Sequence, residues 1–181
     1  MGPVTDLFGD WRTTEDMGND IIHAATRGWD ADASYIWLTK RVGNMCNALK
    51  WANKTIREHW FHNHYFGFTA ENQEWYEKRM AIVNATFPKW ANLWISAEPL
   101  LGPIDLRRED VVIKPKVVIV GCESGPNRRP CRTEWVESIV EQCRAANVPV
   151  FVKQLSIADK CVTDINQFPE HLRIRQLPWA N

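Results

Sequence analysis

Two hydrophobic patterns alternate along the chain. Short β-branched or aromatic runs, typical of buried strands, occur at residues 35–38, 65–68, 93–95, 117–120 and 150–152. Between them, apolar residues recur at three- and four-residue spacing, as in amphipathic helices. These helical stretches cover residues 45–60, 76–87 and 135–143, with a weaker one at 16–26. Strands that alternate with helices predict an α/β fold with a mostly parallel sheet.

Turn and capping residues suggest where these elements begin and end. Thr13 and Thr133 stand directly before two of the helical stretches and are good N-cap residues. Residues 100–115 contain glycine, prolines and charges, so we expect an irregular connection there, with a short edge strand at 111–113. The chain length fits one domain. We therefore predict one α/β domain at 1–156, and a C-terminal extension at 157–181 that wraps around it.

Composition restricts the classes of partner. Lysine and arginine together number 22, as do aspartate and glutamate, so no overall charge attracts nucleic acid or an anionic membrane. No apolar run approaches the roughly 18 residues of a membrane span, and residues 1–10 do not resemble a secretory signal. The five cysteines are odd in number and contain no C-x-x-C pair, which disfavours a disulfide framework. The sequence therefore predicts a cytoplasmic protein that does not bind membranes.

Charged residues follow almost every predicted strand. Because parallel strands present their carboxyl ends on one face, these side chains are expected to share one opening and to bind a ligand there. The alternative is that each charge only marks where the chain leaves the core for solvent. A charged residue recurs directly after nearly every predicted strand, and this regularity favours a ligand site. The residues are Asp6, Lys40, Glu71, Glu98, Glu123 and Lys153.

A glycine-containing loop follows the clearest strand. Backbone N–H groups in such a loop are suited to hold an anion, and arginines follow within reach. A phosphate or nucleotide is the ligand this pattern indicates, and a solvated basic loop is the alternative. The pattern is neither a Walker loop nor a nucleophile elbow. The residues concerned are Gly121, Ser124, Gly125, Arg128 and Arg129.

Three other groups are more simply explained by structure than by chemistry. His59, His62 and His64 come at a predicted helix end, where histidine complements the helix dipole, and their spacing matches no strong zinc signature. A metal site is therefore not favoured. Cys122 stands beside Glu123 with no histidine nearby in sequence, so we expect an unreactive thiol. The tryptophans at 37, 94 and 135 are expected to pack in the core and between helices and sheet.

Several short motifs occur in a fixed order. They are D-L-F-G from Asp6, L-T-K-R at 38–41, E-P-L-L-G-P from Glu98, G-C-E-S-G-P from Gly121, and K-Q from Lys153. With them the chain resembles, over residues 6–154, an uncharacterised phage and prophage family that is radical-SAM-like and carries a three-cysteine motif near its N-terminus. The resemblance implies a partial (β/α) barrel of five to six mostly parallel strands with helices outside. Its active mouth would lie at the carboxyl ends of the strands.

In radical-SAM enzymes, three cysteines spaced C-x-x-x-C-x-x-C hold a [4Fe–4S] cluster that binds and cleaves S-adenosylmethionine. No cysteine here has that spacing. The sequence begins where the family's second strand would end, so we expect the first strand and the cysteine loop to be missing. Glu71, Glu98, Glu123 and Lys153 match the family and are expected to contact the amino-acid or ribose part of the cofactor. Relatives usually show glycine where this chain has Cys122 and tryptophan where it has Leu155.

The resemblance implies a truncated protein without radical chemistry or cofactor of its own. S-adenosylmethionine and the cluster would enter only if a partner supplied the cysteines. A protein partner or a homodimer is expected to cover the open strand edges. The alternatives are the C-terminal half of a split enzyme that modifies a nucleotide or nucleic acid, and a phage anti-defence binding protein in the host cytoplasm. An independent metal or phosphate enzyme is the least favoured hypothesis.

Overall fold

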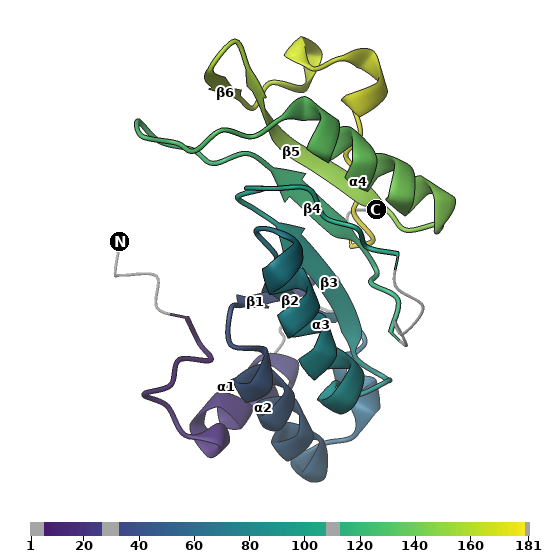
Figure 1. Cartoon of the computed structure of the whole chain (residues 1–181). Helices are drawn as coiled ribbons and strands as arrows, with labels where there is room; N and C mark the ends of the chain where they lie inside the picture. The colour runs from purple at the N-terminus through teal and green to yellow at the C-terminus, as the bar shows by residue number, and fades with distance from the viewer. Residues whose placement is uncertain (1–5, 27–32, 108–112, 180–181) are drawn as a thin grey trace.

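A computed structural model describes residues 6–26, 33–107 and 113–179 of the 181-residue chain. Its six strands form one sheet in sequence order, curled into a half-barrel (Figure 1). The first five strands are parallel, and the last pairs antiparallel with the fifth. The α/β class and the mostly parallel partial barrel are therefore confirmed. The strands are β1 (Tyr35–Thr39), β2 (His64–Thr69), β3 (Asn92–Ala97), β4 (Val118–Gly121), β5 (Val150–Ile157) and β6 (Lys160–Val162).

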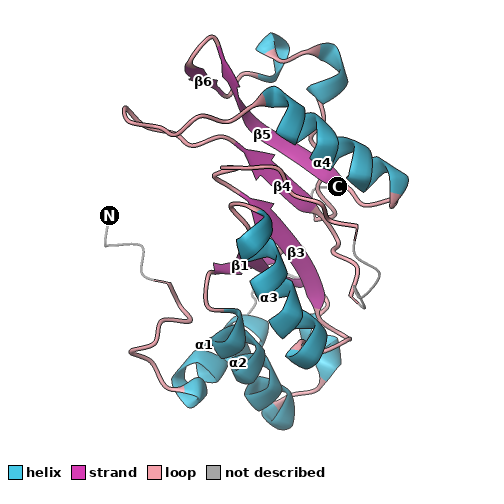
Figure 2. Ribbon diagram, viewed as in Figure 1, coloured by secondary structure: helices cyan, strands magenta, loops and turns pink. Residues whose placement is uncertain are grey.

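Four α-helices accompany the sheet in the described residues, and three of them connect consecutive parallel strands. Figure 2 shows α3 in front of the sheet and α4 beside β5. Single turns of 3₁₀ helix occur at Glu58–Phe61, Ile165–Gln167 and Glu170–Leu172. None of the described helices combines the length and apolar character that crossing a membrane requires. The helices are α1 (Thr14–Thr26), α2 (Val42–Thr55), α3 (Gln73–Thr86) and α4 (Thr133–Ala145).

Local side-chain chemistry explains the helix ends and corrects two predictions. Thr13 caps α1 as predicted, since its Oγ1 accepts a hydrogen bond from the Asp16 amide at 3.1 Å. The cap predicted at Thr133 is wrong, because Thr133 is already the first residue of α4. The apolar spacing predicts a helix that continues to residue 60, but α2 ends at Thr55. Ile56 adopts extended φ and ψ angles, and the chain after it forms only a 3₁₀ turn.

The two faces of the sheet differ in character. Toward the helices, Phe66, Phe68 and Ile95 are fully or almost fully buried. On the opposite, inner face, Trp94 lies across Gly67, and its Nε1 donates a hydrogen bond to the Trp37 carbonyl at 3.0 Å. A Cβ atom at Gly67 would lie 2.4 Å from the Trp94 ring, so only glycine leaves room for it. Trp94 is thus buried, as predicted, but it lies on the inner face and not between the sheet and the helices.

The C-terminal residues return along the sheet edge. The sequence did not predict the hairpin of β5 and β6. After this hairpin the chain returns beside β5, where the Val152 amide donates a hydrogen bond to the Ile174 carbonyl at 2.8 Å. Trp179 then lies with its ring centroid 4.7 Å from that of Tyr65. The predicted domain boundary at 156 falls inside β5. Of the predicted edge strand at 111–113, residues 111 and 112 lie outside the described residues.

Candidate functional site at the carboxyl ends of the strands

Ion pairs connect neighbouring strands where the strands end. Lys40, which follows β1, places Nζ 2.5 Å from Oε1 of Glu71, which follows β2. Glu98, which follows β3, has Oε1 3.1 Å from Nζ of Lys153 on β5. Lys153 was expected to follow its strand, but β5 is longer than predicted and Lys153 lies within it. The parallel sheet thus brings these four predicted residues to one end of the half-barrel.

Glu71 is held by a second cation that sequence reasoning missed. Arg79 of α3 places Nη1 2.6 Å from Glu71 Oε2 and also donates to the Thr69 carbonyl. The two side chains are only 10% and 7% exposed. Burial alone would raise the pKa of Glu71, but hydrogen bonds from Lys40 and Arg79 outweigh it, so the pKa lies below its ordinary value. One signal in the sequence could have identified this residue, because Arg79 falls at helical spacing on a face of α3 that is otherwise apolar.

Glu98 occupies a tight position beside Gly121. A Cβ atom on Gly121 would lie 2.9 Å from Glu98 Oε1, so the glycine allows the carboxylate to approach β4. Ser96 Oγ donates weakly to Glu98 Oε2 at 3.4 Å. Oε1 is buried and has no hydrogen-bond partner among the described residues, although the Lys153 ammonium is close. The Lys153 side chain is 54% exposed, so a donor group of a ligand could replace it as the partner of this oxygen.

The loop after β4 is organised by Glu123 and Arg129. Arg129 donates from Nη2, Nε and its backbone amide to the Glu123 carboxylate, at 2.6, 2.9 and 2.7 Å. These hydrogen bonds lower the pKa of Glu123 to about 2. Gly125 has a φ of 107°, which suits glycine, and Arg128 Nη1 lies 3.4 Å from its carbonyl oxygen. In this arrangement Arg129 neutralises Glu123, and an anion would have to compete for it.

The structure also places three other predicted site residues, which are Asp6, Gly121 and Ser124. Asp6 accepts hydrogen bonds from the Thr39 hydroxyl and the Phe8 amide, and pairs with Arg41 at 3.0 Å. It therefore anchors the segment before α1 to the end of β1. Gly121 is the last residue of β4 and pairs with β5. Ser124 is exposed in the loop.

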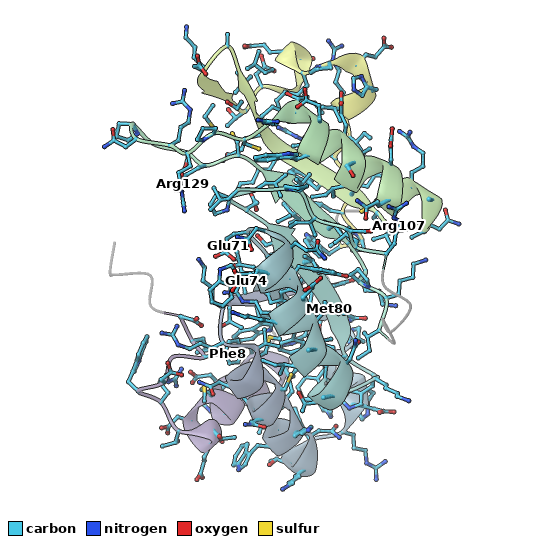
Figure 3. The ribbon with its side chains drawn as sticks, in the orientation of Figure 1. Phe8, Glu71, Glu74, Met80, Arg107 and Arg129 are labelled. Carbon is cyan, nitrogen blue, oxygen red and sulfur yellow. The ribbon has the colours of Figure 1, made fainter. Side chains whose placement is uncertain are left out.

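A cavity of about 230 Å³ opens among these groups. It combines cations, a carboxylate and an amide with apolar side chains and the indole of Trp75, which is 41% exposed. Figure 3 shows Glu71 and Arg129 on the same side of the molecule, with Arg107 on the other. We call this region the charged mouth and define it by Glu98, Lys153 and the residues that line the cavity. Those residues are Lys40, Glu71, Asn72, Trp75, Pro99, Leu101 and Arg129.

Residues 4–167 match the sequence profile of a family described as a protein of unknown function (DUF5131). The chain belongs to this family. Searches of curated proteins and of solved structures found no match. The family description names no reaction, cofactor or source, so the radical-SAM-like relationship and the phage origin stay predictions.

The histidines of this DUF5131 protein do not converge. His64 begins β2 in the core, where Trp37 Nε1 donates to its Nδ1 at 3.1 Å, and burial lowers its pKa to about 4. His59 lies in the 3₁₀ turn before it, and His62 Nδ1 contacts the His59 carbonyl. In the part of the chain that the structure describes, no three metal-ligating side chains are placed to hold an ion.

The cysteines of the DUF5131 chain do not fit an iron–sulfur cluster. Cys46 and Cys143 are buried within α2 and α4. Cys122 and Cys161 approach each other, with their Sγ atoms 3.6 Å apart. Burial is the main cause that raises the pKa of Cys122 to about 12, so this thiol forms little thiolate. A cluster needs deprotonated thiolates at a suitable spacing, which these residues do not offer.

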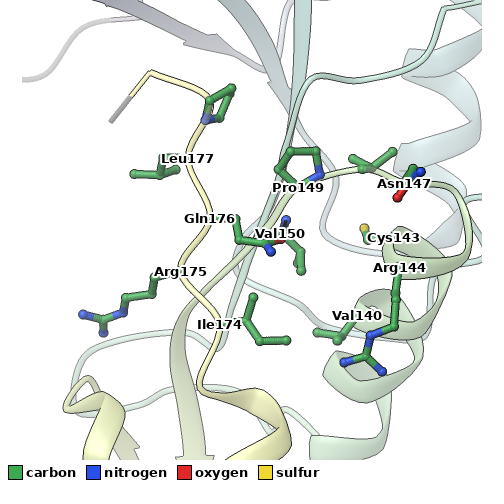
Figure 4. Close-up of a pocket in the computed structure, with 12 residues that line it drawn as sticks. Val140, Cys143, Arg144, Asn147, Pro149, Val150, Ile174, Arg175, Gln176 and Leu177 are labelled. Carbon is green, nitrogen blue, oxygen red and sulfur yellow. Dashed lines mark hydrogen bonds between the residues drawn. The ribbon is translucent and has the colours of Figure 1, made fainter. Parts of the chain in front are cut away.

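A larger cavity, about 740 Å³, lies away from the charged mouth (Figure 4). It is formed by the C-terminal end of α4, the residues before β5 and the returning C-terminal residues. Gln176 closes one wall, since its Oε1 accepts from the Val150 amide at 3.2 Å. Arg144 and Arg175 lie on opposite sides of the cavity (Figure 4), and no carboxylate lines it. Size alone therefore does not make it the better candidate site.

Proposed function

We propose that the charged mouth binds a small zwitterionic nucleoside, with S-adenosylmethionine as the ligand that the family resemblance indicates. The observation that carries the proposal is the buried Oε1 of Glu98, whose cation partner is the exposed Lys153 ammonium at 3.1 Å. The next residue, Pro99, lines a cavity that also has charges of both signs. Lys153, its nearest cation, is 54% exposed and is able to move aside for a ligand. Perturbed, converging charges in a concave region are typical of binding sites.

The groups of the mouth match the parts of such a ligand. Glu98 is suited to accept hydrogen bonds from an ammonium group or ribose hydroxyls. Lys40 and Arg129 are suited to a ligand carboxylate, which would compete with Glu71 and Glu123 for them. The indole of Trp75 is 41% exposed, with Arg79 and Lys78 over its ring, and its exposed part could contact a base. The cavity is smaller than the roughly 300–1,000 Å³ of typical ligand sites, so it would enclose one portion of the ligand while the rest lay across the open mouth.

We propose that these 181 residues do not perform radical chemistry by themselves. Their cysteines lack the spacing for a [4Fe–4S] cluster, and within the described residues no three of them are placed to hold a metal ion. Cluster ligands would have to come from outside these residues, for example from a partner chain. The chain would then bind the ligand and the partner would supply the redox centre, as in the split enzyme that the sequence suggests.

Binding to another protein is a second candidate function, favoured by the edge strand β1. It pairs only with β2 in the described structure, so its other edge is open. Ile36 and Leu38 on this strand are 46% and 44% exposed. An open strand edge with apolar side chains is a ready template for an added strand, from a partner or a second copy. This reading suits the predicted binding module and is compatible with ligand binding at the mouth.

Isothermal titration calorimetry with S-adenosylmethionine tests the first proposal. The wild-type chain is expected to bind, and Glu98→Gln to weaken binding by about tenfold or more, because a hydrogen bond to a charged group contributes about 1.5–3 kcal/mol. Glu137→Gln is the control, since Glu137 lies on α4 and pairs with His171 outside the mouth. No binding to the wild type, or equal loss in both variants, would contradict the proposal.

A further inference from the structure

Cys122 and Cys161 form a pair of thiols from distant parts of the sequence. Cys122 directly follows β4, and Cys161 is the middle residue of β6. Their Sγ atoms are 3.6 Å apart, and neither is part of a disulfide. A disulfide bond has a sulfur–sulfur distance of about 2.0 Å, so closure needs a movement of about 1.6 Å. Movement of this size is within reach of side-chain rotation and a small shift of a hairpin.

The position of the pair connects it to the charged mouth. Cys122 lies between Gly121, which touches Glu98, and Glu123, which orders the loop through Arg129. Cys161 belongs to the three-residue strand β6, which joins β5 through the turn at Ala158 and Asp159. Positive φ angles at both turn residues are those of a tight two-residue hairpin. A bond between the two sulfurs would therefore tie the Glu123 loop to this hairpin.

We propose that Cys122 and Cys161 are a reversible thiol–disulfide pair that a peroxide oxidises. The Cys161 thiolate attacks one peroxide oxygen and releases hydroxide, which leaves a sulfenic acid on Cys161. The Cys122 sulfur then attacks the Cys161 sulfur and displaces water, which closes the disulfide. Together the thiols lose two electrons and two protons, and hydrogen peroxide is reduced to two waters. A small thiol reductant reverses the reaction by thiol–disulfide exchange.

Exposure and charge assign the order of the two steps. Cys122 is buried, and burial together with the neighbouring Cys161 thiol raises its pKa to about 12, so it forms little thiolate. Cys161 is only partly buried and is the thiol that peroxide reaches first. Cys131 is also buried nearby, and burial raises its pKa to about 11. Cys131 is therefore the matched control: it is a nearby buried cysteine that does not contact Cys161 as Cys122 does.

Peptide mapping by mass spectrometry after treatment of the full chain with hydrogen peroxide tests the proposal. The result expected is a Cys122–Cys161 linked peptide, lost after addition of dithiothreitol, and retained in Cys131→Ser. Cys161→Ser should protect Cys122 from oxidation, because the first thiolate is then absent. Cys122→Ser should instead leave a sulfenic acid on Cys161, detected with dimedone.

Two results would overturn the proposal. One is oxidation of Cys161 to sulfinic acid in the wild type while Cys122 stays reduced. The other is a link between Cys131 and Cys161 in place of the expected one. Circular dichroism of each variant before oxidation separates these outcomes from a failure to fold. If the variants do not fold, the oxidised wild type still decides the question, because its peptides are either linked or unlinked.

Discussion

Glu71 and Arg79 show how single residues shape the charged mouth. A nearly buried carboxylate is tolerated there because two cations surround it, one from the end of β1 and one from α3. Removing one member of such a pair leaves an uncompensated buried charge. The sequence indicated Glu71 from its place after a strand. Arg79 escaped prediction because, without the fold, an arginine in a helix is usually assigned to solvent.

Glu71→Gln is expected to lower the free energy of unfolding by about 3–5 kcal/mol, the typical cost of breaking a buried ion pair. Urea denaturation measures this change. Glu74→Gln is the matched control, because Glu74 forms an exposed pair with Lys78 one helical turn apart, and such exposed pairs contribute little to stability. Similar losses in the two variants would show that the Glu71–Arg79 pair is not buried as described.

His64 gives the fold a pH dependence of its own. Its pKa is about 4 in the folded state, against 6.5 for an ordinary histidine, so the unfolded chain binds the proton more readily. Stability is therefore full above pH 6.5 and falls as the pH decreases toward 4. Carboxylates with lowered pKa values, such as Glu71, lose their contribution only below about 4.5. Between pH 6.5 and pH 4.5, protonation linked to His64 should lower the free energy of unfolding by about 2–3 kcal/mol.

Urea denaturation of the wild type and of His64→Gln between pH 7 and pH 4.5 checks this expectation. The glutamine keeps a hydrogen-bond acceptor for Trp37 but does not titrate in this range. The stability of the variant should therefore depend on pH less steeply than that of the wild type. Parallel curves would mean that another group causes the dependence.

At the scale of elements, the strands were the easiest to predict. The runs at 65–68 and 117–120 are apolar because both faces of β2 and β4 are largely buried. The run at 35–38 also predicts β1 correctly, although Ile36 and Leu38 remain exposed. Elements set by tertiary contacts were missed. β6 has only three residues and no apolar pattern, and it exists because it pairs with the end of β5. The end of α2 depends on the backbone angles at Ile56.

Gly67→Ala tests the packing of three strands at one point. The added Cβ would collide with the Trp94 ring and disturb its hydrogen bond to the Trp37 carbonyl, so we expect a loss of about 1–3 kcal/mol in unfolding free energy. Gly43→Ala in α2 is the control, because no atom lies within 4 Å of its added Cβ. It should stabilise the helix by about 0.5–1 kcal/mol. A neutral Gly67→Ala would contradict the inner-face packing of Trp94.

At the scale of the whole molecule, the parallel arrangement decides where chemistry gathers. Lys40, Glu71 and Glu98 are far apart in sequence and meet because β1, β2 and β3 run in the same direction. The sequence predicted this convergence from the charge after each strand. It did not predict the cavity, because Trp75 and Leu101 come from a helix and a loop whose positions depend on the complete fold. Nor did it predict that Trp179 returns to the inner face.

Hydrogen–deuterium exchange with and without S-adenosylmethionine tests the central claim most directly, because it locates binding on the whole chain. We predict that the ligand slows exchange in the segments that form the charged mouth, at residues 70–73, 98–101 and 121–124. Unchanged exchange there, or protection confined to residues 144–150 and 174–178 around the larger cavity, would contradict the account.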